Sequence, residues 1–289
     1  MEKVYHYTTL TALMGMLSNP IEMEGEKSLI MWASSILTLN DPTEFKLGYN
    51  HIKSKLLIIE KELQIEDKYK ISSIFQDKTK AKDIDNMFLE NMHLSNYLPY
   101  VISFSKKGDF LPMWKMYGDN AKGVCLCFNN MEYKYLDNNI FIENKVNAID
   151  VCYGGLNFDY DNFLYRWYKK FYKDAKNNRN KLFEKKIEYV IAMFVACAPL
   201  IKNVDYQYED EVRLVKCAKN ENCVLFRQNV HGSIVPYIEV PIPIKYLIEI
   251  KIGPCSDYNS IKGSLLHMLK AYGVEKRVKI ISSSVSYRE

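Results

Sequence analysis

The stretch Val4-Tyr5-His6-Tyr7-Thr8-Thr9-Leu10 predicts a short strand that leads directly into a helix. Residues 3–7 can form the strand, and apolar side chains then recur at helical spacing as far as Leu17. Thr9 or Thr11 would cap this helix, because a threonine hydroxyl accepts a hydrogen bond from the first turn. The stretch therefore places His6 at the end of a strand.

The rest of the chain alternates between strand-like and helical segments, without an internal repeat or a linker. Asp41 is the expected cap of a helix that opens at Pro42. Helical insertions are predicted near residues 46–98 and 158–200, and shorter helices at 110–117 and 256–271. Strands are predicted at 29–33, 100–105, 123–128, 147–153, 211–217, 222–227, 235–240, 246–252 and 277–282. This order favours an α+β fold with a mixed, mostly antiparallel sheet, in a single domain over residues 1–289.

Composition excludes several classes of protein. The chain has 289 residues, of which 48% are hydrophobic and 26% charged, as in ordinary globular proteins. The net charge of +4 is too small to imply nucleic-acid binding by itself. The apolar run from Tyr189 to Ile201 is shorter than the roughly 20 residues of a membrane span and contains Pro199, so a buried helix is expected and no membrane partner. Seven scattered cysteines without a disulfide framework or a signal peptide indicate a cytoplasmic protein.

Three polar elements stand on or beside predicted strands. His6 ends the first strand, Ser103 and Ser105 alternate on a later one, and Glu209 and Glu211 stand where another strand begins. Each has a plain structural alternative: a histidine bonded to backbone, a polar strand end, or a solvated glutamate paired with Arg213. Taken together they suit cleavage of the bond between nicotinamide and ribose. That reaction needs a positioned dinucleotide and a carboxylate near the developing positive charge.

Further side chains are candidates for the wall of such a site. Trp114 and Tyr117 are three residues apart on a predicted helix, so they would share a face beside the serines. Core packing explains them equally well. Asn40, Asp41 and Glu44 are also candidates for the cleft, although helix capping accounts for Asp41.

Metal chemistry has little support in the sequence. Cys125 and Cys127 can share a strand face, but no second pair of Cys or His has matching spacing. We therefore expect no metal. The chain also lacks a phosphate-binding P-loop, a Rossmann glycine fingerprint and a serine-hydrolase elbow.

One basic tract, residues 166–186, interleaves lysines and arginines with Trp167, Tyr168, Phe171 and Tyr172. Such a tract can bind phosphates and stack bases. The alternative is an amphipathic helix with a solvated basic face, and it is the one that we favour.

Several segments resemble known proteins. The first motif is similar to that of DarT-type ADP-ribosyltransferases. More closely, the chain resembles a widespread bacterial domain-of-unknown-function family placed near that superfamily. The resemblance runs through most of the chain, and its motifs are His6-Tyr7-Thr8, Leu39-Asn40-Asp41-Pro42-Thr43-Glu44-Phe45, Ile102-Ser103-Phe104-Ser105, Trp114-x-x-Tyr117-Gly118, Gly123-Val124-Cys125, Tyr208-Glu209-Asp210-Glu211-Val212-Arg213 and Ile252-Gly253-Pro254.

The resemblance implies an ADP-ribosyltransferase-like fold and NAD as substrate. Glu211 matches the catalytic glutamate, with Glu209 as the first of the pair. The implied NAD-binding residues are His6, Thr8, Ser103, Ser105, Trp114, Tyr117 and Arg213. The acceptor would be nucleic acid or protein, and analogy suggests a toxin or a phage-defence effector.

The motif set is mixed. Arginine-class transferases carry Arg where this chain has His6, and histidine-class enzymes usually carry Tyr where it has Ser103. NAD hydrolysis and a catalytically silent nucleotide-sensing or partner-binding module therefore remain alternatives to transfer.

Overall fold

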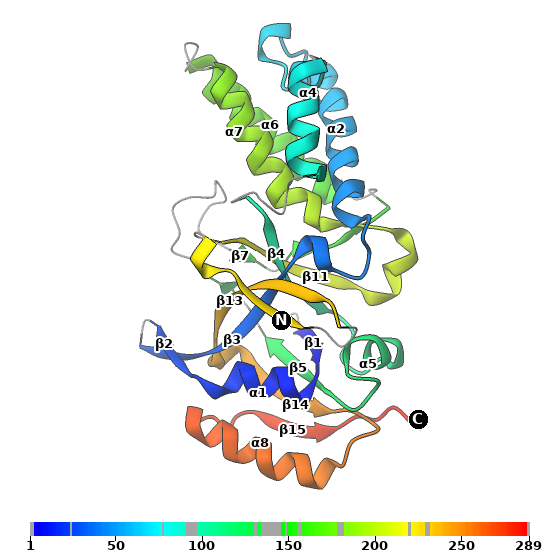
Figure 1. Ribbon diagram of the computed structural model, residues 1–289, viewed down its shortest axis with the longest axis vertical. Coiled ribbons are helices and arrows are strands. Elements are labelled where there is room, and N and C mark those ends of the chain that lie inside the picture. The colour runs from blue at the N-terminus through cyan, green and yellow to red at the C-terminus, as the bar shows by residue number, and fades with distance from the viewer. Residues whose placement is uncertain are drawn as a thin grey trace.

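The computed structural model describes residues 3–23, 25–76, 78–90, 97–129, 132–133, 146–147, 149–154, 158–177, 182–218, 221–228 and 232–287. Helices gather at one end of a twisted sheet, and two further helices lie at its opposite end (Figure 1). The α+β class and the mostly antiparallel sheet are confirmed, because within the large sheet β14 (Leu247–Ile252) and β15 (Lys279–Ser282) form the one parallel pair among the described strands.

The first strand and helix form as predicted. β1 covers Lys3–Thr8 and α1 covers Leu10–Ser18. Thr9 is the N-cap, and its hydroxyl accepts a hydrogen bond of 3.0 Å from the amide of Ala12. β1 lies between β4 (Pro99–Ser105) and β5 (Val124–Asn129), antiparallel to both. His6 therefore stands in the interior of the sheet.

Strand β4 joins the two halves of the sheet. One of its edges pairs along its length with β11 (Glu211–Cys217), which sets Glu211 opposite Ser105 and Arg213 opposite Ser103. Its other edge is shared by two strands. Ser34 and Ser35 of β3 (Glu26–Ser35) lie opposite its first half, and Tyr5 of β1 lies opposite its last residue.

The two arms of the sheet extend away from β4. One arm continues from β3 to β13 (Ile234–Pro243) and ends at β12 (Leu225–Gln228), and β2 (Ile21–Met23) also pairs with β3. The other arm runs from β1 through β5 and β14 to β15. The helix α8 (Tyr258–Tyr272) lies with α1 at the end of the molecule farthest from the other long helices (Figure 1).

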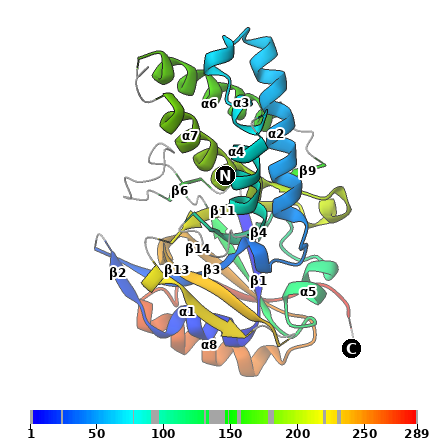
Figure 2. The ribbon, with the colours of Figure 1, turned by 45° about the horizontal axis from the view of Figure 1, so that its top comes forward.

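We call the group of α2 (Glu44–Glu62), α4 (Lys78–Asp85), α6 (Phe158–Asn177) and α7 (Leu182–Cys197) the helical lobe. The same group stands above the sheet in a second view (Figure 2). Aromatic side chains fill its interior, and the rings of Tyr49 and Phe194 lie 4.4 Å apart. Both predicted insertions thus contribute to one helical body.

Several details of the lobe differ from the sequence prediction. Asp41 is not the N-cap of α2, because Thr43 takes that position and the helix begins at Glu44. Asp41 instead accepts hydrogen bonds from the amide and the hydroxyl of Thr43, which closes the preceding turn. Segment 46–98 is broken as well: α2 is followed by a 3-10 turn, the short α3 (Ser73–Gln76), α4 and a π-helical turn at Asn86–Glu90.

The predicted strand at 147–153 is also divided. β8 (Ile149–Asp150) pairs with β11, and β9 (Cys152–Tyr153) pairs in parallel with β10 (Ile201–Lys202) in a separate small sheet. A second small sheet joins β6 (Glu132–Tyr133) to β7 (Val146–Asn147). Among the described residues, no helix is long and apolar enough to cross a membrane.

Candidate functional site

A cavity of about 100 Å³ opens where β1, β4 and β11 meet. Because a buried water needs about 10–15 Å³ on the same measure, the cavity has room for a small chemical group but not for a dinucleotide. Strands, the turn before α2, and α5 (Leu111–Tyr117) all contribute to its lining. The lining residues are Tyr5, His6, Tyr7, Leu39, Asn40, Ser103, Phe104, Ser105, Met113, Tyr117, Lys202, Glu209, Glu211 and Arg213.

Glu211 is held by a two-pronged contact with Arg213. The guanidinium Nε donates to one carboxylate oxygen at 2.7 Å and Nη2 to the other at 2.8 Å. The two residues are neighbours on one face of β11, because strand side chains alternate. Burial alone would raise the pKa of Glu211, but the charges of Arg213 and Lys202 hold that pKa at about 2. The carboxylate is therefore ionised at every physiological pH.

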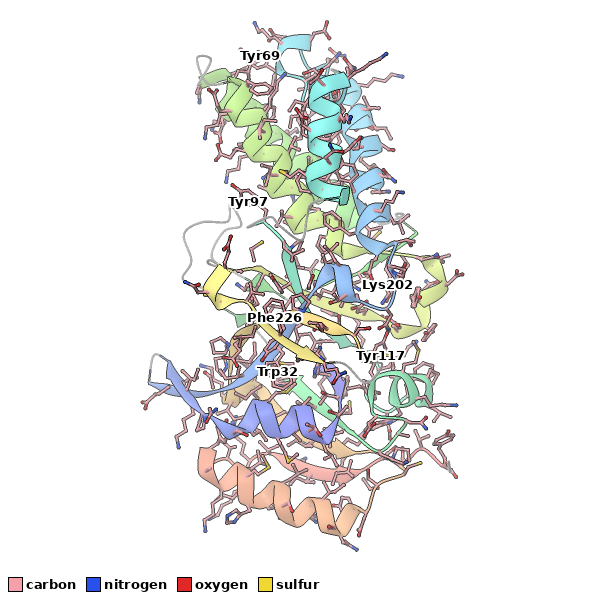
Figure 3. The ribbon with its side chains drawn as sticks, viewed as in Figure 1. Trp32, Tyr69, Tyr97, Tyr117, Lys202 and Phe226 are labelled. Atoms are coloured by element: carbon pink, nitrogen blue, oxygen red, sulfur yellow. The ribbon has the colours of Figure 1, made fainter. Side chains whose placement is uncertain are left out.

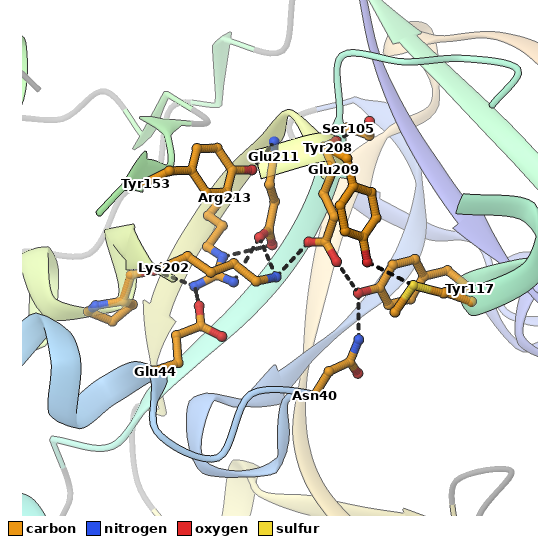
Figure 4. A network of polar contacts seen from close by, with 12 residues as sticks. Asn40, Glu44, Ser105, Tyr117, Tyr153, Lys202, Tyr208, Glu209, Glu211 and Arg213 are labelled. Carbon is orange, nitrogen blue, oxygen red and sulfur yellow. Dashed lines mark hydrogen bonds and ion pairs between the residues drawn. The ribbon is translucent and has the colours of Figure 1, made fainter. Parts of the chain in front are cut away.

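Lys202 connects the two glutamates of the Glu-x-Glu pair. Its ammonium donates to Glu209 at 2.6 Å and to Glu211 at 3.0 Å. The other oxygen of Glu209 accepts a hydrogen bond of 2.6 Å from the Tyr117 hydroxyl, which in turn accepts one from the Asn40 amide. Figure 4 shows this chain of contacts running from Arg213 to Asn40.

Glu44 adds a third carboxylate, since it forms an ion pair with Arg213. We call Glu44, Lys202, Glu209, Glu211 and Arg213 the charged network. All five side chains are at most 5% exposed. Burial raises the pKa of Glu44 above its ordinary value, and the Arg213 charge offsets this only in part. Three carboxylates face two cations, so the network carries one negative charge when all five groups are ionised.

His6 lines the cavity and is oriented by the backbone of β4. Its Nδ1 lies 2.9 Å from the carbonyl oxygen of Ser103, so Nδ1 carries the proton and donates it. Burial lowers the pKa of His6, and the charge of Arg227 lowers it further. The ring is thus neutral at pH 7, with Nε2 as a hydrogen-bond acceptor.

The two serines of the Ser-x-Ser element have different partners. The side chain of Ser103 helps to lower the pKa of the Glu211 carboxyl group. The Ser105 hydroxyl is fully buried, donates to the carbonyl of Glu209 at 2.6 Å and accepts from the amide of Lys107 at 3.0 Å. Ser105 therefore fixes the backbone that carries Glu209 and is not available to a ligand.

Two predicted site residues lie outside the cavity lining. Thr8 continues β1 past His6 and pairs with Val124. The expected shared wall of Trp114 and Tyr117 is wrong, because α5 presents Met113 and Tyr117 to the cavity, which are four residues apart. Trp114 is fully buried: its Nε1 donates to Asp109 at 2.8 Å and its ring packs edge-on against Tyr7 at 5.0 Å.

Sequence reasoning missed Lys202 and Tyr153. Lys202 ends an apolar segment that follows α7, and a lone charged residue in a buried run is the signal that was available. Tyr153 accepts a hydrogen bond of 2.7 Å from the amide of Glu211. No local pattern around Tyr153 indicates this contact, because it depends on the pairing of β8, just before β9, with β11.

Three of the four aromatic rings of the basic tract are buried and do not face solvent, whereas Tyr172 is partly exposed. Trp167, Tyr168 and Phe171 are at most 9% exposed and face the core of the helical lobe. Arg166 and the lysines of α6 occupy its solvent side. The favoured interpretation, an amphipathic helix with a solvated basic face, is confirmed for the part of the tract on α6. Lys186, on α7, is instead buried and donates to the Ser73 hydroxyl. Arg179 and Lys181 lie outside the described residues.

Residues 113–214 match a family model described as "Protein of unknown function (DUF2971)". This confirms the likeness to a domain-of-unknown-function family, and the matched region includes Tyr117, Lys202 and the Glu-x-Glu pair. No curated protein and no solved structure matches the chain. The likeness to ADP-ribosyltransferases remains a prediction.

Proposed function

We propose that the protein is an NAD-dependent ADP-ribosyltransferase that binds the nicotinamide-ribose end of NAD at this cavity. The observation that carries the proposal is the meeting of His6, Ser103 and Glu211 at one cavity, although they lie on three strands far apart in the sequence. If each residue had only a structural role, the three side chains would not need to line the same cavity. Binding sites, in contrast, are concave and combine apolar walls with a few polar groups.

The reaction breaks the bond between C1′ of the ribose and the ring nitrogen of nicotinamide, and the electron pair leaves with nicotinamide. A nucleophile then bonds to C1′ and loses its proton. With water as nucleophile the products are ADP-ribose, nicotinamide and a proton. Positive charge develops on the ribose as the first bond breaks, so a fixed negative charge nearby lowers the barrier.

The charged network supplies that charge. Glu211 stays ionised because Arg213 and Lys202 lower its pKa to about 2. The network as a whole carries one negative charge when Glu44 is ionised as well. His6 contributes a neutral acceptor, Nε2, for a ribose hydroxyl. In this mechanism Ser103 aligns Glu211, and Tyr117 aligns Glu209 toward the incoming nucleophile.

A second candidate, a nucleotide-sensing module without catalysis, is favoured by one observation. Both oxygens of Glu211 are already engaged by Arg213, and one of them also by Lys202. Such pairing reduces the field that Glu211 exerts on a ribose. Such a site suits a protein that binds a nucleotide without cleaving it.

The test is nicotinamide release from NAD by the purified full chain, with and without cell lysate or nucleic acid. Glu211→Gln should reduce release at least about 100-fold, in the range seen when a preorganised electrostatic group is removed. Glu22→Gln, an exposed strand glutamate, is the matched control and should keep full activity. Attachment of ADP-ribose to protein or nucleic acid in the lysate identifies transfer, whereas nicotinamide release without such attachment identifies hydrolysis.

Because Glu211→Gln disturbs a buried ion network, Ser103→Ala and His6→Gln provide milder variants of the same site. Circular dichroism establishes that each variant is folded. The absence of release from folded wild-type protein under every condition contradicts the enzyme proposal and leaves the sensing module. Calorimetric titration with NAD then tests that module.

A further inference from the structure

Arg227, on the edge strand β12, lies outside the charged network, and no carboxylate among the described residues forms an ion pair with it. Its Nη2 donates to the Ser34 hydroxyl at 3.0 Å. Its Nε is buried and has no acceptor among the described residues. The guanidinium lies 5.9 Å from the ring centroid of Trp32, which itself contacts the ring of Tyr237 at 5.3 Å.

An arginine in this setting is unusual. The guanidinium carries five donors in a rigid fork that suits carboxylates and phosphates. Burial lowers the pKa of Arg227 below its ordinary value. The Trp32 ring covers one face of the guanidinium, but it accepts no hydrogen bond from the N–H groups at the edge. The group is therefore arranged to receive an anion.

The register of the sheet places this guanidinium on the same face as the cavity. Ser34 lies opposite Val101 of β4, and Ser103 stands two residues farther along that strand, on the same side. Arg227 crosses β13 and reaches back to Ser34 on β3. Ser34, which accepts the hydrogen bond from Arg227, is thus about one strand spacing, ~4.8 Å, from β4 and about two residues, ~7 Å, along from Ser103.

Arg227 and the cavity also interact electrostatically, since the charge of Arg227 lowers the pKa of His6. Figure 3 labels Trp32 on the sheet, with Tyr117 and Lys202 marking the cavity. In NAD the diphosphate begins one carbon beyond the nicotinamide ribose. A ribose at His6 and Ser103 brings a diphosphate to the neighbourhood of Ser34.

We propose that Arg227, held by Ser34 and stacked on Trp32, is the anion subsite that binds the diphosphate of the dinucleotide. This inference rests on the proposed function, because it assumes that the nicotinamide ribose occupies the cavity. It extends the site beyond the small cavity and explains how a dinucleotide is held when only one end fits inside.

The experiment is calorimetric titration of the full chain with ADP, AMP and inorganic pyrophosphate. Loss of the fork in Arg227→Gln should weaken ADP binding about 10- to 100-fold, the value of one or two charge-assisted hydrogen bonds. Arg166→Gln removes an exposed arginine of α6 and should leave binding unchanged. Arg227→Lys keeps the charge without the fork and should recover only part of the affinity.

The same variants are then assayed for nicotinamide release. The expected result is a raised KM for NAD in Arg227→Gln with kcat within about two-fold of wild type, because the diphosphate is remote from the bond that breaks. Equal ADP affinity in wild type and Arg227→Gln, or no ADP binding by wild type, overturns the subsite. Pyrophosphate that binds as tightly as ADP, with the same dependence on Arg227, supports recognition of the diphosphate alone.

The two proposals fail separately. If ADP binding requires Arg227 but NAD is never cleaved, the subsite stands and the transferase proposal falls. If NAD is cleaved in a Glu211-dependent way while Arg227→Gln leaves both KM and ADP affinity unchanged, the enzyme stands and the subsite falls. Retention of the Arg227→Gln fold is checked by its thermal transition, since β12 is an edge strand.

Discussion

Two buried carboxylates, Glu60 in the helical lobe and Glu211 in the sheet, have contrasting surroundings. Within the described part of the chain, Glu60 on α2 accepts hydrogen bonds from neutral donors alone: the amide of Ser72 at 2.9 Å, the Ser72 hydroxyl, and the Tyr168 hydroxyl at 2.7 Å. Glu211 faces two cations and a cavity. The neutral donors around Glu60 suit a carboxylate that connects the helices of the lobe. The two cations around Glu211 keep it ionised next to a cavity, where it can act on a ligand.

The largest expected effect separates these two carboxylates. Glu211→Gln leaves Arg213 and Lys202 buried with less compensating charge, so it should cost about 3–5 kcal/mol of unfolding free energy. It should also abolish most nicotinamide release. Urea denaturation and the release assay measure the two losses. A Glu211→Gln protein as stable and as active as wild type contradicts the functional contrast with Glu60.

The second prediction concerns the connection between the lobe and the site. Gly48 of α2 packs so tightly on the segment after α7 that a Cβ would lie 2.2 Å from the Ala198 carbonyl oxygen. The next residue, Pro199, accepts a hydrogen bond of 2.5 Å from Arg213. Gly48→Ala should therefore destabilise the protein by about 1–3 kcal/mol, as overpacking does.

Because Gly48→Ala displaces Pro199, we expect it to lower nicotinamide release as well. Gly263 of α8 has open space around its position, so Gly263→Ala is the matched control. Full activity in a measurably destabilised Gly48→Ala protein would show that the lobe and the charged network are independent.

The third prediction tests the structural carboxylate. Glu60→Gln keeps one acceptor oxygen but loses the other, so one hydrogen bond from Ser72 or Tyr168 is lost at about 1 kcal/mol. Nicotinamide release should be unchanged at a temperature where the variant is folded. Reduced release from folded Glu60→Gln would remove the distinction between the two carboxylates.

The smallest effect is a pH dependence that involves His6. Burial lowers its pKa in the folded state, so below the unfolded value of about 6.5 the unfolded chain binds more protons than the native protein. Stability due to His6 is thus present above pH 6.5 and falls as the pH decreases. In His6→Gln the unfolding free energy should fall less steeply between about pH 7 and 5 than it does in the wild type. Parallel urea titrations at several pH values measure the slopes, and equal slopes contradict a neutral buried His6.

Local patterns predicted much of the fold and the polar residues of the site. The Thr9 cap, the strands around His6 and Ser103, and the shared face of Glu211 and Arg213 follow from side-chain alternation and capping, which depend only on neighbours in the sequence. The same local reasoning misplaced Asp41 as a helix cap and Trp114 as a cavity wall. Each side chain had two locally acceptable positions, and long-range packing selected between them.

The tertiary structure alone decided what surrounds these residues. Lys202 reaches both glutamates because α7 returns the chain to the base of α2. Tyr153 meets Glu211 because β8, just before β9, pairs with β11. Arg227 reaches Ser34 across 193 positions of sequence. The sequence by itself determined which strands carry polar side chains. Pairing between distant strands determined their partners, because a buried charge is stabilised by whatever the fold brings to it and not by its neighbours along the chain.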